Sequence, residues 1–497
     1  MGAAADERPA RDAGSVTGVT TTTHPLLARI ARSTAATDTP TAPLAALHQW
    51  WQEVREADDS RVELIPFEAM RSWSFAPGTG NLVHDTGRFF SVEGLRVHRP
   101  EGPVPHWSQP ILNQPEVGVL GILAKEFGGV LHFLMQAKME PGNCNGLQLS
   151  PTVQATLSNY TRVHKGGSVP YIDHFLSRDR HRVLVDVRQS EQGSWFHRKR
   201  NRNMVVEVTE DVEVRPGFRW VTLGQLHRLL AVDDLVNMDA RSILACLPFP
   251  FEGVTGEGRR EPGTELLSWL TEARSMERVL AERVPLAGLP GWRRRPDRIS
   301  HEDGAFFDIV AVDVTTGGRE VGGWTQPLLR PRGQGVSAFV TKRVGGVRHV
   351  LASVRVEAGC ADVLELGPTV QYTPENYARL PAGALPPLLD EVLGAPAERV
   401  LFDTVLSEEG GRLHHARSRY LIVEEDANVG DGADGGHRGD GGPPGSPGHR
   451  WIPMDELVGL MQHSHYVNVE ARTLVACLQS VCGPAERRPA RSHGKGA

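Results

Sequence analysis

Cysteine is scarce in this sequence, and no two cysteines are spaced as a C-x-x-C pair. The five are Cys144, Cys246, Cys360, Cys477 and Cys482. This spacing argues against a dense disulfide framework and fits a reducing compartment better than a secreted protein. We therefore expect a cytoplasmic protein.

Long apolar runs and an excess of positive charge are also missing. No uninterrupted apolar run reaches the roughly 18 residues that indicate a membrane-spanning helix, so we expect no membrane contact. The chain has 54 Lys and Arg against 60 Asp and Glu, a formal net charge of -6. Nucleic-acid binding needs a basic face that displaces counterions, so the sequence predicts no nucleic-acid partner.

Cofactor signatures are absent as well. No Gly-x-Gly-x-x-Gly follows a predicted strand, and the histidine spacings at 414–415 and 463–465 are too sparse for a metal cluster. The sequence therefore predicts no cofactor and no metal ion.

The length of the chain predicts two domains. At 497 residues it exceeds the size of one hydrophobic core. Three segments lack the periodic apolar residues that would offset the entropy of ordering: both ends and a Gly/Pro/Asp-rich insertion. We predict the following division: a disordered tail at 1–40, a first module at 41–255, a second module at 256–483 with a disordered insertion at 427–449, and a disordered tail at 484–497.

An internal repeat supports this division. The segment WSQPIL at 107–112 recurs as WTQPLL at 324–329, which is 217 residues further along. The same register holds without a gap over a long stretch. It pairs Gly128-Gly129 with Gly345-Gly346, His132 with His349, Glu140 with Glu357, and Asn159-Tyr160 with Asn376-Tyr377. The chain therefore contains two tandem copies of one module.

Each copy has the pattern of a mixed α+β module. Apolar residues around a Gly-Gly pair at 117–140 predict two strands joined by a hairpin turn, and 182–190 predicts another strand. In 222–236 and 237–247 apolar residues recur at intervals of three and four residues, which predicts helices. A further helix is predicted at 265–282, between the copies. The expected fold is α+β, with a curved sheet and packed helices in each copy.

Several long segments resemble the NDP-hexose 2,3-dehydratases, and together they cover most of the chain outside the tails and the insertion. The segments are FFSVEGLRV, WSQPIL, GILAKEFGGVLHFLMQAKMEPGN, LSPTVQATLSNYTRVHKGG and RSRYLIVE. The resemblance implies conversion of TDP-4-keto-6-deoxyglucose to TDP-3,4-diketo-2,6-dideoxyglucose, in 2,6-dideoxysugar biosynthesis for antibiotic glycosylation. It also implies a homodimer that works together with a 3-ketoreductase, and two modules that each resemble the Nudix-hydrolase fold.

One implication can be tested on the sequence. A working Nudix hydrolase needs a Gly-x5-Glu-x7-Arg-Glu-x-x-Glu-Glu-x-Gly helix, whose carboxylates hold Mg²⁺ on a pyrophosphate. Neither half of the sequence contains this motif. We therefore expect diphosphate-sugar binding without metal-dependent hydrolysis.

The implied reaction needs only acid and base groups. The C4 ketone of the substrate acidifies the C3 proton, and the C2 hydroxyl lies β to that ketone. A general base can take the C3 proton while donors hold the enolate oxygen and a general acid protonates the departing hydroxyl. The resulting enol tautomerises to the 3-ketone, so no nicotinamide, pyridoxal phosphate or metal is required.

Three groups of residues are predicted to bind the nucleotide sugar. Small donors and an aromatic ring suit hydroxyls, phosphates and the base; a turn with a packed tyrosine is the alternative. These residues are Thr156, Ser158, Asn159 and Tyr160, with Thr373, Asn376 and Tyr377 in the second copy. Side chains near two strand ends suit a diphosphate, unless they are only solvated: Arg200, Asn203, Arg417, Arg419 and Tyr420. Trp73 and Trp292 could stack on the base or pack in the core.

Catalytic residues are expected in one copy only, because one copy need retain the chemistry. His164 and Lys165 have no counterpart in the second copy. If the first copy is the active one, Tyr160 or His164 would be the base or acid, and Lys165 the stabiliser of the enolate. His132 and Glu140, which recur in both copies, are expected to be structural.

Two other function classes remain open on the sequence. A nucleotide-sugar binding protein without turnover, partnering a ketoreductase or a glycosyltransferase, would show the same duplication. A metal-dependent diphosphohydrolase is the third class. Only assays distinguish the three.

Overall fold

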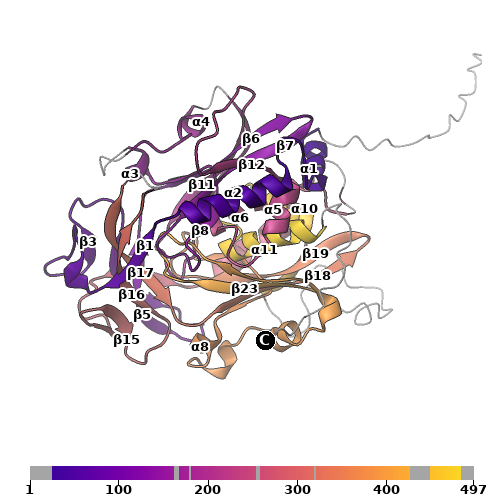
Figure 1. Ribbon diagram of the computed structural model, residues 1–497. Helices are drawn as coiled ribbons and strands as arrows, with labels where there is room; N and C mark the ends of the chain where they lie inside the picture. The colour runs from indigo at the N-terminus through magenta and orange to yellow at the C-terminus, as the bar shows by residue number, and fades with distance from the viewer. Residues whose placement is uncertain are drawn as a thin grey trace, which may run out of the picture.

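The computed structural model describes residues 25–161, 167–177, 181–252, 254, 258–317, 321–425 and 448–482. These residues form a mixed α+β structure whose strands make four sheets (Figure 1). The α+β class predicted from the sequence is confirmed. No described helix combines the length and apolar character needed to cross a membrane.

The first seven-stranded sheet is built from residues 118–222. Its strands are β6 (Gly118–Phe127), β7 (Val130–Met139), β8 (Leu147–Ser150), β9 (Val153–Ala155), β10 (Arg182–Ser190), β11 (Arg200–Glu207) and β12 (Phe218–Thr222). The order is β10-β11-β6-β7-β12, with β8 beside β7 and β9 beside β6. Only the β11–β6 pair is parallel.

The second seven-stranded sheet has the same strand order. Its strands are β18 (Gly335–Val344), β19 (Val347–Val356), β20 (Leu364–Gly367), β21 (Val370–Tyr372), β22 (Val400–Ser407), β23 (Arg417–Glu424) and β24 (His449–Pro453). They run β22-β23-β18-β19-β24, with β20 beside β19 and β21 beside β18. The parallel pair is again the equivalent one, β18 with β23.

The predicted glycine hairpins occur in both sheets. Gly128 and Gly129 join β6 to β7 with φ of 55° and 79°, and Gly345 and Gly346 join β18 to β19 with φ of 57° and 82°. Two consecutive residues with positive φ fit the twist of a hairpin, and glycine adopts this conformation without a steric cost.

Each of the two five-stranded sheets includes one strand from the other half of the chain. β1 (Arg61–Ile65) pairs with β16 (Phe307–Thr315), whereas β13 (Leu280–Val284) pairs with β4 (Ser91–His98). The remaining strands are β2 (Trp73–Phe75), β3 (Leu82–His84) and β5 (His106–Asn113) beside β4, and β14 (Trp292–Arg294), β15 (Arg298–His301) and β17 (Gly323–Pro331) beside β16. Each five-stranded sheet therefore contains residues from both sides of the predicted boundary at 255.

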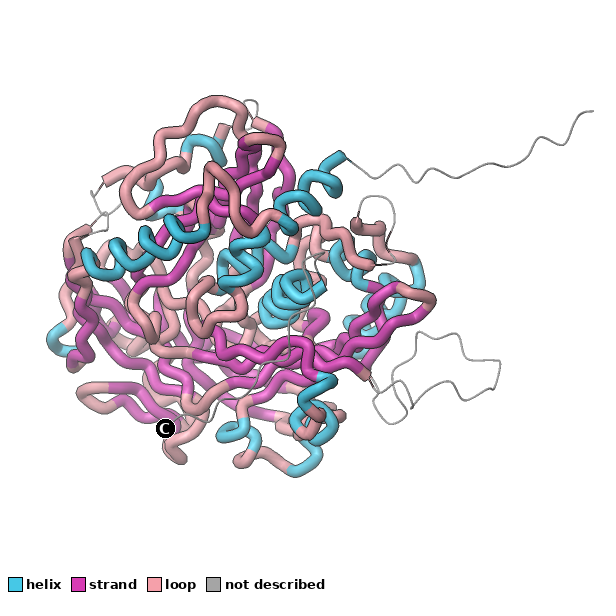
Figure 2. The backbone as a smooth tube through the Cα atoms, turned by 45° about the vertical axis from the view of Figure 1, so that its right-hand side comes forward, coloured by secondary structure: helices cyan, strands magenta, loops and turns pink. Residues whose placement is uncertain are grey.

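Four helices fill the space between the seven-stranded sheets, as both backbone views show (Figures 1 and 2). They are α5 (Leu223–Leu229), α6 (Met238–Ala245), α10 (Met454–Leu460) and α11 (Val469–Cys482). The largest hydrophobic cluster joins these helices to both sheets, and α6 packs directly on α11. The predicted helices at 222–236 and 237–247 correspond to α5 and α6, whose N-caps Thr222 and Asn237 accept backbone hydrogen bonds.

Two buried arginines on α6 and α11 form hydrogen bonds between the two halves of the chain. Arg241 on α6 donates to the carbonyl oxygens of Val236 at 2.5 Å and Ser407 at 2.6 Å. Arg472 on α11 donates to the carbonyl oxygens of Val467 and Ser190, both at 2.6 Å. Each guanidinium therefore satisfies one carbonyl from its own half and one from the other half.

We expect Arg241→Met to lower the free energy of unfolding by about 3–5 kcal/mol, because it leaves buried polar partners without a donor. Unfolding in urea, followed by circular dichroism, measures this change. The matched control is Arg228→Met on the exposed side of α5, for which a change within about 0.5 kcal/mol is expected. Equal stabilities of the two variants would contradict the role assigned to Arg241.

The structure differs from two sequence predictions. Part of the predicted N-terminal tail is helical: α1 (Pro25–Ala35) buries Leu26, Leu27 and Ile30, and is followed by α2 (Leu44–Ala57). Arg29 of α1 pairs with Glu207 and Glu126, which anchors the helix on the first sheet. The predicted helix at 265–282 ends early, since α7 (Thr264–Met276) gives way to β13.

Several short helical segments complete the described structure: α3 (Leu157–Tyr160), α4 (Asp173–Leu176), α8 (Pro374–Tyr377), α9 (Leu389–Leu393), η1 (Phe67–Ala69), η3 (Ala382–Ala384) and η4 (Ala397–Arg399). Residues 1–24 and 483–497, and most of the predicted insertion at 427–449, lie outside the described residues.

Candidate active site

A polar cavity opens beside the first seven-stranded sheet. It contains about 650 Å³ of empty space, part of it open to solvent. Most of its lining comes from the first half of the chain: Gln114, Gly118, Leu120, Lys138, Glu140, Pro141, Gln154, Ala155, Thr156, Asn159, Glu191, Phe196, Lys199, Asn201 and Asp239. The second half adds Trp324, Gln326, Glu409, Gly411 and Arg412. Both halves are therefore needed to form the cavity.

The wall from the second half is held by close backbone contacts. The amide of Gly142 donates to the carbonyl of Gly410 at 2.7 Å, and the amide of His415 donates to the carbonyl of Gly142 at 2.7 Å. A Cβ atom on Gly142 would lie 1.7 Å from the carbonyl oxygen of Leu413. Only glycine fits at this position, so the loop around Glu409 is fixed against the first half.

Four carboxylic acids meet at the cavity from four different segments. Glu140 follows β7, Glu191 follows β10, Asp239 lies in the first turn of α6, and Glu409 comes from the loop after β22. Gln154 donates to Glu140 at 2.8 Å, and Asn201 donates to Glu191 at 2.6 Å. In the described part of the chain, one oxygen each of Glu191, Asp239 and Glu409 is buried without a hydrogen-bond partner. Such oxygens are available to a ligand.

Lys199 is the buried cation next to these acids. It directly precedes β11, and its ammonium donates to the carbonyl oxygen of Glu116 at 2.6 Å. An ammonium has three N–H donors, so this bond leaves two for other partners. Burial lowers the pKa of Lys199 to about 8, while the negative charge of Glu191 opposes this shift. The lysine therefore carries its charge at neutral pH and loses it under mildly alkaline conditions.

The acids are shifted in the opposite direction. Burial raises the pKa of Glu409 to about 8, with a further contribution from the charge of Glu140. Burial also raises the pKa of Glu191, and that of Asp239 well above its usual value. Desolvation disfavours the charged form of each acid. Glu409 thus holds a proton at neutral pH, which suits a general acid.

The equivalent place in the second half has different chemistry. The repeat register puts Arg355 at the position of Lys138, Ala416 at that of Lys199 and Gln192 at that of Glu409. Arg355 is engaged within its own half, since it pairs with Glu357 at 3.0 Å and donates to the carbonyl of Gln371 at 3.1 Å. The combination of a lysine with an extra acid therefore occurs at the first site only.

The structure brings a few of the predicted site residues to this cavity. Thr156 and Asn159 line it. Ser158 is buried behind them and donates to the carboxylate of Glu116. Tyr160 is outside the lining and packs against a hydrophobic cluster. His164 and Lys165 lie outside the described residues.

The remaining predicted binding residues are placed elsewhere. Trp73 and Trp292 are buried in one hydrophobic cluster, and the indole of Trp292 donates to the carbonyl of Ser108. Of the two alternatives for these tryptophans, stacking on a base or packing in the core, the structure shows packing in the core. The arginines of the second half pair with carboxylates at close range: Arg417 with Asp234 at 2.6 Å and Arg419 with Asp403 at 2.8 Å.

The other members of these groups are also away from the cavity lining. Tyr420 is fully buried and donates to Glu408 at 2.9 Å. Asn203 is buried beside Asn201, and Arg200 is partly exposed on β11. Thr373 precedes α8, Asn376 accepts a hydrogen bond from the amide of Phe306, and Tyr377 packs edge-on against Tyr372. These residues do not meet the acids of the first site.

Sequence reasoning missed Lys199, Glu191, Asp239, Glu409 and Arg412. A signal for two of them exists in the repeat, because Lys199 faces Ala416 and Glu409 faces Gln192 in the alignment of the copies. Residues found in one copy only were the expected carriers of chemistry, and this criterion would have included both.

Comparison with known proteins identifies the family. The model of the NDP-hexose 2,3-dehydratase family matches residues 44–247 and 263–478. Three curated relatives are each named dTDP-4-dehydro-6-deoxy-alpha-D-glucopyranose 2,3-dehydratase. The chain is 48% identical to the one from Amycolatopsis orientalis (92% of this chain, 94% of the relative), 47% identical to the one from Saccharopolyspora spinosa (88% and 92%) and 49% identical to the one from Streptomyces violaceoruber (88% and 97%).

The chain therefore belongs to the NDP-hexose 2,3-dehydratase family. Among solved structures, a crystal structure of an ADP compounds hydrolase aligns with 35% of this chain and 84% of its own length, at 13% identity. Its TM-score of 0.21 is too low to support any argument about the fold.

Proposed function

We propose that this protein is a dTDP-4-keto-6-deoxyglucose 2,3-dehydratase whose active site is the cavity beside the first seven-stranded sheet. The identity of 47–49% to relatives with this named activity supports the substrate. The grouping of Lys199 with Glu409 and Glu191 at one cavity carries the proposal for the site. It supplies a cation, an acid and a base at one cavity.

The base and the enolate stabiliser follow from the charges. Glu191 takes the C3 proton, since its free oxygen is buried and its raised pKa makes it a stronger base than an ordinary carboxylate. The electrons of the broken C3–H bond form the enolate, whose oxygen at C4 becomes negative. Lys199 donates to this oxygen, and a preorganised cation is most effective where charge develops.

Glu409 completes the elimination as the general acid. Its proton goes to the C2 hydroxyl as the C2–O bond breaks and the C2=C3 double bond forms, so water leaves. The product is an enol at C3, which takes a proton at C2 and becomes the 3,4-diketone. This protonation can draw on solvent. Thr156 and Asn159 on the cavity wall are placed to bind the sugar or its diphosphate.

The finer features expected from the sequence remain part of this proposal. We propose that the chain consists of two Nudix-like modules at 41–255 and 256–483, and that it acts as a cytoplasmic homodimer. The shared strand order of the two seven-stranded sheets supports the modular part. A 3-ketoreductase is the natural consumer of the product, because a vicinal diketone is reactive and its reduction at C3 traps it.

The test is to incubate the purified protein with dTDP-4-keto-6-deoxyglucose in heavy water, with and without a 3-ketoreductase and NADPH. We expect loss of water from the sugar and deuterium at C2, detected by mass spectrometry and NMR, without added Mg²⁺. Unchanged substrate would leave only the nucleotide-sugar binding protein. Mg²⁺-dependent release of TMP would instead identify a diphosphohydrolase.

A further inference from the structure

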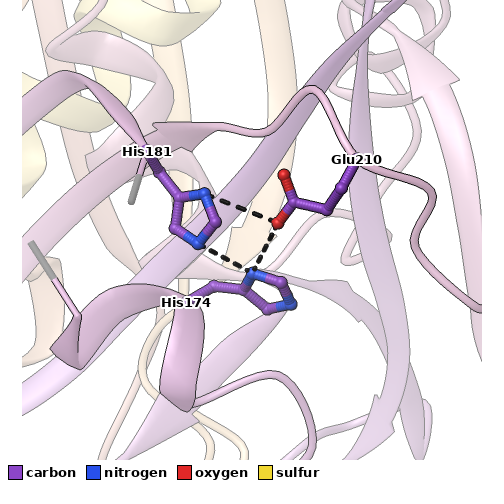
Figure 3. A group of neighbouring side chains, drawn as sticks. All are labelled: His174, His181 and Glu210. Atoms are coloured by element: carbon purple, nitrogen blue, oxygen red, sulfur yellow. Dashed lines mark hydrogen bonds and ion pairs between the residues drawn. The ribbon is translucent and has the colours of Figure 1, made fainter. Parts of the chain in front are cut away.

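A second cluster of chemically active side chains lies outside the dehydration cavity. His174 lies on α4, His181 directly precedes β10, and Glu210 follows β11, and their side chains converge (Figure 3). His174 Nδ1 is 3.2 Å from His181 Nε2 and 3.7 Å from Glu210 Oε1, and His181 Nδ1 is 3.5 Å from the same oxygen. None of the three residues lines the cavity.

One ligand atom from each residue can be chosen so that all three lie within 4.8 Å of one another, which is close enough for the three side chains to share one ion. Zinc binds imidazole nitrogen at about 2.0–2.1 Å and carboxylate oxygen at about 2.0–2.2 Å, which places neighbouring ligand atoms about 3.3 Å apart. Two imidazoles and one carboxylate suit zinc and similar transition ions, whereas Ca²⁺ and Mg²⁺ prefer oxygen ligands throughout. The cluster therefore has the ligand types of a zinc site, brought close together by the fold.

A buried nitrogen of His181 also lacks a hydrogen-bond partner in the described part of the chain. The side chain of His181 is only 7% exposed, and its Nδ1 has no hydrogen-bond partner among the described residues. A buried nitrogen without a partner is costly unless a ligand satisfies it.

The surrounding structure holds the third ligand in place. Lys125 on β6 donates to the carbonyl oxygen of Glu210 at 2.6 Å and to the carboxylate of Asp211 at 2.8 Å, which fixes the segment after β11. The side chain of Glu210 is 45% exposed, so solvent can reach the cluster. A water molecule can therefore fill the fourth position around an ion.

The repeat argues that this cluster is not a by-product of the shared fold. At the same register the second half has Glu391, Glu398 and Ala427 in place of the two histidines and the glutamate. The first half alone thus carries this set of two histidines and one glutamate. It is also the half that contributes most of the dehydration cavity.

We propose that His174, His181 and Glu210 bind one zinc ion or a similar divalent transition metal in a structural role. The ion would join α4 and the start of β10 to the segment after β11. Phe175 of α4 already packs on Gly121, where a Cβ atom would lie 2.3 Å from its ring. The metal therefore pins α4 against β6 and β11, behind the cavity wall.

The experiment uses the full chain without a histidine tag, treated with a chelator and dialysed. Zinc chloride is titrated calorimetrically, and cobalt chloride is titrated in parallel by absorption spectroscopy. We expect one zinc per chain and a tetrahedral cobalt spectrum. His181→Gln and Glu210→Gln should each weaken zinc binding by about 100-fold. Loss of a residue that only supports a metal ligand typically costs about 10–100-fold, and loss of a ligand should cost at least as much. Since Glu210 is nearly half exposed, Glu210→Gln should keep the fold, which circular dichroism verifies.

The matched control is His106→Gln. His98 and His106 form another histidine pair, with Nδ1 atoms 3.0 Å apart, on the exposed face of β4 and β5. This variant should bind zinc as the unmodified protein does. The proposal is overturned if the unmodified protein binds no stoichiometric zinc, if Glu210→Gln binds it equally well, or if His106→Gln abolishes binding.

Discussion

Replacement of Lys199 by alanine should lower kcat for dehydration by about 10²–10³-fold, which corresponds to about 3–4 kcal/mol of lost transition-state stabilisation. The substitution installs the residue that the second half already has at the equivalent position, Ala416. It removes the ammonium that balances the developing enolate. Steady-state kinetics with a coupled ketoreductase measure kcat and KM separately. The loss should fall mainly on kcat, because the negative charge at C4 arises only during the reaction.

Lys342→Ala is the control for this variant. Lys342 lies on β18 near Glu425 and over the ring of Trp451, and it does not line the cavity. Its removal should leave kcat within about twofold of the unmodified protein. If Lys199→Ala kept nearly full kcat, the enolate stabiliser would have to be another donor, such as Lys138 or Arg412.

Replacement of Glu409 by glutamine should lower kcat by about 10²–10⁴-fold, the range typical of a lost general acid. The amide keeps the size of the side chain but cannot deliver a proton to the C2 hydroxyl. The repeat again supplies the precedent, since Gln192 of the first half occupies the position that matches Glu409. Kinetics at saturating substrate, with the fold verified by circular dichroism, test the prediction.

The pH profile distinguishes this role from a structural one. Glu409 and Lys199 both act in the protonated form, and the pKa of each is about 8. The rate of the unmodified protein should therefore fall above pH 8, with the loss of two protons. In Glu409→Gln only Lys199 still loses a proton on the alkaline side of the profile. The rate should therefore fall with pH about half as steeply as in the unmodified protein. An unchanged slope would contradict the assignment of Glu409 as the acid.

The acidic side of the profile depends on Glu191, which must be deprotonated to act as the base. Burial raises the pKa of this carboxyl. The rate should accordingly decline as the pH falls toward the acid range, and at a higher pH than an ordinary glutamate would give. Together the two limbs make a bell-shaped profile.

Much of the local structure could be predicted from the sequence. The Gly-Gly pairs require positive φ in both copies, and this fixed the hairpins β6–β7 and β18–β19. The three-and-four spacing of apolar residues located α5 and α6. The exchange of β1 and β13 between the halves could not be predicted, because strands with the same apolar pattern can pair with either sheet. A five-residue strand such as β1 or β13 has too few residues for its sequence to specify which strand it pairs with.

The candidate site was harder to predict for a different reason. Glu140 recurs in both copies, so the sequence favoured a structural role for it. Glu191 also recurs as Glu408 and was not singled out, although burial and its neighbours set its chemistry. The arginines 417 and 419 were good diphosphate ligands by residue type. Their partners are Asp234, from the loop before α6, and Asp403, from β22, and only the folded chain brings each pair together.

The exchange of β1 and β13 has a consequence for the history of the molecule. A chain cut near residue 255 gives two pieces, each of which lacks the edge strand that completes one five-stranded sheet. A single-copy ancestor with this topology would have reached the same architecture only by lending its strand to an identical neighbour, as domain-swapped dimers do. Within one polypeptide the two pockets need not be identical, and the sequence has Lys199 at one where the other has Ala416.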